Sequence, residues 1–119
     1  MSLLSRLFGN PATASASAPQ AVDVQEASRR QAAGALLVDV RQPEEWRQGH
    51  APRAKLIPLG SLATRLSEVP RDREVLLICR SGNRSGAAQR QLLQLGYEQV
   101  FNVSGGMTAW TLAGLPVER

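Results

Sequence analysis

The sequence predicts one α/β domain, built on a central parallel sheet of about five strands with helices on both faces. Short apolar runs of strand type alternate along the chain with stretches of helical periodicity, which is the order of elements that a parallel sheet requires. The runs at 36–40 and 75–78 are almost continuously apolar, as in strands that are buried on both faces. A length of 119 residues is sufficient for one domain with its own core.

Residues 1–20 are predicted to form a flexible N-terminal tail, and residues 21–119 the domain. Residues 11–19 are small and uncharged, which is typical of a linker. The apolar residues 1–9 leave export or membrane association as a minor alternative, although this patch is short for a signal peptide and lacks a charged start. No run reaches the roughly 18–20 apolar residues of a membrane span. With a single thiol, the expected location is the cytoplasm, where thiols stay reduced.

The first part of the domain is expected to contain three strands and three helices. Asp23 and Glu26 form a capping box that opens a helix ending near Ala33. Pro43 suits the first turn of a second helix, which ends at Gly49. The other elements predicted here are a short strand at Val22, a buried strand over Leu36–Val40, a strand over Lys55–Leu59 and a helix from Ser61 to about Ser67.

The second part of the domain is expected to contain two strands and two helices. A strand over Glu74–Ile78 ends at the only cysteine of the chain, Cys79. A helix with one apolar face begins near Ser85 and stops at Gly96. The last predicted elements are a strand over Gln99–Val103, a tight loop at Ser104–Gly106 and a helix over Met107–Ala113.

Cys79 follows a strand and faces the start of a helix across a short polar loop, which is where open α/β sheets bind their ligands. Backbone N–H groups in such a loop can form an anion-binding nest, and the helix start adds a partial positive charge. Both effects, together with Arg80 and Arg84, favour thiolate over thiol. Gly82 and Asn83 tolerate the positive φ that a loop with inward amides requires. We therefore predict a sulfur-anion site with Cys79 as nucleophile and a binding loop of Arg80, Ser81, Gly82, Asn83, Arg84 and Ser85.

The distribution of charge favours a small anionic substrate over nucleic acid. The formal net charge is +4, and residues 75–97 contain three arginines and no acidic residue, which would speed the capture of a small anion. No nucleic-acid-binding motif is present. One cysteine and one histidine are too few for a zinc site. We therefore expect no metal. Because the chain has no second cysteine, any group that Cys79 takes up must be passed to another molecule.

Four segments carry a family resemblance. They are Leu37–Arg41 followed by Pro43–Trp46 and Gly49–His50, then Leu77–Ser85, Leu95–Tyr97 and Val103–Trp110. In this order and spacing they resemble a single rhodanese (sulfurtransferase) domain, and the resemblance covers residues 22–118. It implies the three-layer rhodanese-like fold, with the central parallel sheet between two layers of helices.

The resemblance also implies a covalent mechanism that needs no cofactor. The Cys79 thiolate attacks the outer sulfur of a donor such as thiosulfate or glutathione persulfide, becomes a persulfide, and passes the sulfur to cyanide or a thiol, including a protein thiol. Arg80 and Arg84 are expected to attract the anionic donor. A general-base role for His50 is a lesser alternative, because a thiolate held by the loop needs no base. The residues expected to brace the loops below the site are Asp39, Arg41, Glu45, His50, Gly105 and Gly106.

One departure from the family pattern and two alternative functions qualify this interpretation. Arg53 stands where the family usually has glycine, so we expect either a different backbone path or an added cation at the pocket rim. Cysteine phosphatases and arsenate reductases have five residues between cysteine and arginine, whereas four separate Cys79 from Arg84, and this shorter loop suits one sulfur atom better than phosphate. The second alternative is a rhodanese module that binds a partner without catalysis, or a carrier that delivers persulfide sulfur to a protein partner.

Overall fold

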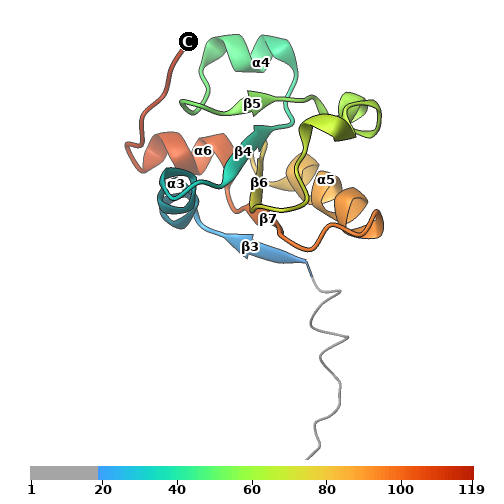
Figure 1. Cartoon of the computed structure of the whole chain (residues 1–119). Coiled ribbons are helices and arrows are strands. Elements are labelled where there is room, and N and C mark those ends of the chain that lie inside the picture. Colours follow the sequence, from blue (N-terminus) through green and yellow to red (C-terminus); the bar gives the residue numbers. More distant parts are fainter. Residues whose placement is uncertain (1–18) are drawn as a thin grey trace, which may run out of the picture.

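One sheet of five strands forms the centre of the protein, in a computed structural model that describes residues 19–119 (Figure 1). The strands are β3 (Gln20–Val22), β4 (Leu36–Asp39), β5 (Lys55–Leu56), β6 (Val75–Ile78) and β7 (Val100–Val103). All neighbouring strands pair in parallel, in the order β3-β7-β6-β4-β5. Because β6 and β4 lie inside the sheet, both of their faces are covered, which accounts for their apolar sequences. The predicted α/β fold with about five parallel strands is confirmed.

Helices cover both faces of this sheet and complete three layers (Figure 1). They are α3 (Val24–Ala32), α4 (Pro43–Gln48), the 3-10 helices η1 (Leu59–Thr64) and η2 (Leu66–Glu68), α5 (Asn83–Gln94) and α6 (Gly106–Leu112). α3 and α6 pack together on one face, whereas α5 and η1 pack together on the other. α4 follows β4, at the end of the sheet where the strands terminate.

Successive side chains of β6 enter two separate cores, because the side chains of a strand alternate between its faces. Leu77 and Cys79 belong to the core beneath α5. Leu76 and Ile78 belong to the core beneath α3 and α6, together with Trp110. The period of two thus directs the Cys79 side chain toward α5 and away from α6.

Two predicted segments differ from the structure. The helix predicted from Ser61 is replaced by η1 and η2, in which the Ser61 N–H donates to the Pro58 carbonyl oxygen at 2.8 Å. Leu62 is the only buried residue of η1, so the segment lacks an apolar face long enough to hold an α-helix. The strand predicted over Lys55–Leu59 ends already at Leu56, because Pro58 has no N–H to donate to a neighbouring strand.

The start of α5 also differs from the prediction. α5 begins at Asn83, and Gly82 precedes it in the left-handed conformation, with φ at 110°. Of the two loop residues that tolerate positive φ, only Gly82 adopts it, because Asn83 is the first helical residue. Among residues 19–119, the only residue other than glycine with positive φ is Arg53, at 63°.

The predicted N-terminal tail lies outside the described residues except at its end. Gln20 pairs with Phe101 in the sheet, so the first strand begins one residue before the predicted start of the domain. Within the described part of the chain, no helix is both long enough and apolar enough to cross a membrane.

Candidate active site

The Cys79 sulfur lies just beyond β6, against the first turn of α5. It accepts hydrogen bonds from the Gly82 N–H at 3.1 Å and from the Ser85 hydroxyl at 3.2 Å. Gly82 turns the chain into α5 through a backbone conformation that costs glycine little. The first N–H groups of α5, which have no partner within the helix, can then serve the sulfur. With a side chain only 1% exposed, Cys79 is almost enclosed by this loop.

The hydrogen bonds to Cys79 favour its thiolate. Burial alone would raise the pKa of Cys79, but the Ser85 hydroxyl and the backbone N–H groups of Ser85, Gly82 and Ser81 outweigh it, so that the pKa lies below the usual value of a thiol. From the sequence, we expected Arg80 and Arg84 to contribute to this preference for the thiolate. In the structure, hydrogen bonds are the principal cause, and Arg84 interacts with Cys79 only as a lesser charge.

Arg84, in the first turn of α5, is bound by Glu45 of α4. Its two terminal nitrogens donate to the two carboxylate oxygens of Glu45 at 2.7 and 2.8 Å, which is the bidentate geometry of strong ion pairs. The hydrogen bond from Arg84 is the main reason that the pKa of Glu45 falls to about 2. The pair therefore stays ionised at neutral pH and joins α4 to the start of α5.

Asp39 and Arg41 form a buried ion pair at the end of β4. Their side chains are 0% and 7% exposed, and Arg41 Nη2 lies 2.8 Å from Asp39 Oδ2. The same Arg41 nitrogen donates to the Gly49 carbonyl oxygen at 2.7 Å. Because Gly49 ends α4, this bond attaches α4 to the end of β4, which is the kind of bracing that the family resemblance implies.

Gly106 allows α6 to approach the backbone beside Cys79. The Met107 N–H donates to the Cys79 carbonyl oxygen at 2.8 Å. A Cβ atom on Gly106 would overlap this oxygen and come within 2.6 Å of the Arg80 carbonyl oxygen. Gly105, with φ at 78°, precedes the helix in the left-handed conformation. The two glycines thus set the position of α6 behind the loop.

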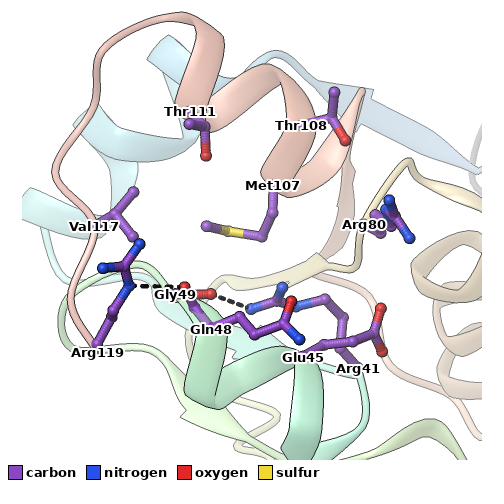
Figure 2. A pocket seen from close by; sticks show the side chains of 10 residues that line it. All are labelled: Arg41, Glu45, Gln48, Gly49, Arg80, Met107, Thr108, Thr111, Val117 and Arg119. Carbon is purple, nitrogen blue, oxygen red and sulfur yellow. Dashed lines mark hydrogen bonds between the residues drawn. The ribbon is translucent and has the colours of Figure 1, made fainter.

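A cavity of about 420 Å³ lies beside the loop, on the α6 side (Figure 2). Figure 2 shows Arg80 at one end, Arg119 at the other and the Met107 side chain between them. Arg119 Nε donates to the Gln48 carbonyl oxygen at 3.0 Å. Cys79 is absent from the lining, because strand alternation directs its side chain to the opposite side of the backbone. The cavity therefore borders the loop without containing the sulfur.

His50 lies against the C-terminal segment. Its ring stacks on Trp46 with 3.6 Å between ring centroids, its Nδ1 donates to the Trp46 carbonyl oxygen at 2.8 Å, and its backbone pairs with Glu118. Within residues 19–119, no hydrogen bond joins His50 to Cys79. This geometry does not support the general-base alternative.

Nearly the whole described domain matches one known family: residues 23–113 match the rhodanese-like domain. This chain belongs to the rhodanese family. A sulfurtransferase of Allochromatium vinosum is 48% identical to it over 82 residues, which cover 69% of this chain and 77% of that protein.

Two solved structures place this rhodanese fold in proteins of different size. A rhodanese-related protein from Thermoplasma volcanium is 30% identical, with a TM-score of 0.77 over 83% of this chain and 97% of that chain. The NAD-dependent persulfide reductase from A. fulgidus is 34% identical, with a TM-score of 0.65 over 77% of this chain but only 16% of that chain. The match thus spans almost all of the first protein and a small part of the second.

The structure brings most of the predicted rhodanese site residues to one end of the sheet, but it separates Arg53 from them. Arg53 lines another hollow, which it shares with Gln31 and Arg73. The expected cation at the pocket rim is therefore wrong. The expected change of backbone path is unnecessary as well, since Arg53 itself adopts a left-handed conformation, with φ at 63°, that glycine adopts freely. Across residues 19–119, no group of three or more His, Cys, Asp or Glu side chains gathers as a metal site would require.

Asn102 contacts the Cys79 loop, although the sequence did not indicate it as a site residue. Its Oδ1 accepts a hydrogen bond from the Ser85 hydroxyl at 2.6 Å, and its Nδ2 donates to the Gly82 carbonyl oxygen at 3.1 Å. A signal was present, because Asn102 is the one polar residue of β7 and lies near the carboxyl end of that strand, where such sheets place functional groups.

Proposed function

We propose that this rhodanese domain is an enzyme that moves a sulfane sulfur from a donor, thiosulfate or glutathione persulfide, to cyanide or a thiol through a persulfide on Cys79. The observation that carries the proposal is the sulfur of Cys79 bonded by Gly82 and Ser85. A thiolate is the attacking species in such chemistry. Inward N–H groups that stabilise it can also hold the charged outer sulfur of a persulfide.

Two substitutions at sulfur complete the proposed cycle. The Cys79 thiolate attacks the outer sulfur of thiosulfate, the S–S bond of the donor breaks, and sulfite leaves with the electron pair. Cyanide or a thiolate then attacks the outer sulfur of the Cys79 persulfide, and the electron pair of the breaking bond returns to Cys79. No net oxidation of the protein occurs, so this cycle needs no cofactor or metal. We place it in the cytoplasm, where a lone thiol stays reduced.

The alternatives receive less support from the geometry. A cysteine phosphatase would turn its loop arginine toward the phosphate, whereas Arg84 is bound by Glu45 through both terminal nitrogens. A module that only binds a partner would have no use for a thiol whose hydrogen bonds favour the thiolate. A carrier that delivers persulfide sulfur to a protein thiol shares the first step of the cycle and differs only in its acceptor.

The proposal predicts that a sulfur donor loads Cys79. After incubation with thiosulfate or glutathione persulfide, intact-mass spectrometry should show an increase of about 32 Da for each sulfur bound. Peptide mapping should place this mass on Cys79, and subsequent cyanide should remove it. If a protein thiol removes the bound sulfur but cyanide does not, the result would favour the carrier. Failure of every donor to load a folded protein would contradict the enzyme.

Removing Arg84 is expected to weaken the reaction with anionic donors. In Arg84→Ala, the Glu45 carboxylate loses its cation and stands as an uncompensated negative charge near the start of α5, where the anionic donor must approach. We expect kcat/KM for thiosulfate to fall roughly tenfold, as measured by thiocyanate formation with cyanide. Arg84→Ala combined with Glu45→Gln should recover most of this loss, because the unpaired charge is then absent.

Arg90→Ala is the matched control for this experiment. Arg90 is an exposed cation on the same helix, so its loss removes the same net charge without leaving Glu45 unpaired. We expect its effect on kcat/KM to stay below about twofold. An Arg84→Ala variant with unchanged kcat/KM would show that the Arg84–Glu45 pair does not act on the donor.

A further inference from the structure

The hydroxyl of Ser85 lies between two hydrogen-bond acceptors. Its oxygen is 2.6 Å from Asn102 Oδ1 and 3.2 Å from Cys79 Sγ. A serine hydroxyl carries one proton and donates to one acceptor at a time. Asn102 and Cys79 therefore compete for the same proton.

The orientation of the Asn102 amide is determined by its other contact. Nδ2 donates to the Gly82 carbonyl oxygen at 3.1 Å. Turning the amide over would bring Oδ1 against this carbonyl, so that two acceptors would face each other. The oxygen of Asn102 therefore faces Ser85 and acts only as an acceptor of its proton.

The charge on Sγ decides which acceptor receives the proton. When Cys79 is a neutral thiol, its weak S–H can donate to the Ser85 oxygen while Ser85 donates to Asn102. When Cys79 is a thiolate, the charged sulfur is the stronger acceptor, and the hydroxyl turns to it. In a persulfide the charge moves to the outer sulfur, so the proton can return to Asn102.

We propose that Asn102 is a positioning residue. It accepts the hydrogen bond of the Ser85 hydroxyl while Sγ is uncharged, and it loses this hydrogen bond to Sγ when Sγ becomes a thiolate. Its effect on the free thiol does not depend on the proposed sulfur transfer. Its effect on turnover rests on that function: as an acceptor attacks the outer sulfur, the S–S bond breaks, its electron pair goes to Sγ, and the Ser85 O–H turns from Asn102 to Sγ.

The charged groups near Cys79 belong to elements other than the strand that carries Asn102. Neither β7 nor α6 contains a charged residue. The charged side chains of the surrounding segments are Arg80 after β6, Arg84 and Arg90 on α5, Asp39 and Arg41 at the end of β4, and Glu45 on α4. A neutral substitution at Asn102 leaves all of them in place, so it tests the competition for the proton.

The decisive measurement is a pH titration of the Cys79 thiolate by its ultraviolet absorbance in the full chain, before any donor is added. Asn102→Leu keeps the branching at Cγ but removes the competing acceptor, so its titration should move to lower pH. Its rate of alkylation at a pH below the midpoint should rise roughly fivefold. Asn102→Asp offers a stronger acceptor and a negative charge, so its titration should move to higher pH.

The Ser85→Ala background separates positioning from general loosening of the loop. Ser85→Ala alone should move the titration to higher pH, and Asn102→Leu should then add no further shift. If Asn102 had a merely structural role, the thiolate titrations of Asn102→Leu and Asn102→Asp would move in the same direction, whether or not Ser85 is present. Asn102→Ala, which also lacks the acceptor, replaces the Leu variant if near-ultraviolet circular dichroism shows that the latter is misfolded.

Three results would overturn the proposal: a titration of Asn102→Leu at higher pH, an unchanged titration, or an equal shift in the Ser85→Ala background. A protein that no donor loads would contradict the proposed sulfur transfer but would leave this titration interpretable. The two inferences therefore fail in different measurements.

Discussion

Cys79→Ser is expected to abolish thiocyanate formation from thiosulfate and cyanide, with a loss of at least about a thousandfold. Serine retains the shape and the hydrogen-bond contacts of the side chain, but its hydroxyl does not ionise near neutral pH and cannot carry a transferable sulfur. The gain of about 32 Da from the donor should disappear at the same time.

The stability of this variant is the control. Cys79 is almost fully buried in the core beneath α5, so the smaller and more polar serine should cost about 1–2 kcal/mol of unfolding free energy. A folded Cys79→Ser protein that keeps turnover would show that another group is the nucleophile.

Gly106→Ala is expected to destabilise the fold by about 3–5 kcal/mol, because the new methyl group meets backbone atoms that cannot move aside. It would overlap the Cys79 carbonyl oxygen and approach the Arg80 carbonyl oxygen to 2.6 Å. A positive φ of 55° adds backbone strain for alanine. The expected fall in Tm is about 12–25 °C, and sulfur loading of Cys79 should weaken as α6 is displaced.

Gly114→Ala separates the two contributions to this loss. Gly114 also has positive φ, at 74°, but a Cβ atom there meets nothing within 4 Å. Its replacement should therefore cost only the backbone strain, about 1–2 kcal/mol. Equal losses in the two variants, measured by denaturant unfolding, would show that the close approach of α6 to Cys79 has no energetic importance.

Local patterns were sufficient to predict most of the fold. The apolar residues of β4 and β6 are contiguous because both strands are interior, and a buried strand has no polar face. Asp23 does cap α3 by accepting from the Glu26 N–H at 2.8 Å, as the capping box indicated. The segment after Pro58 was mispredicted because helical propensity over six residues does not decide between an α-helix and a 3-10 helix without packing.

The sequence by itself determined that Cys79 ends a buried strand and precedes a glycine that leads into a helix, because both features depend on neighbouring residues. Only the tertiary structure decided which groups surround the sulfur. Glu45 and Arg84 are 39 positions apart in the chain, and Ser85 and Asn102 are 17 apart. These pairs meet because β7 lies beside β6 and α4 stands at the end of β4. Strand order brings distant side chains into contact, and no local pattern in the sequence records it.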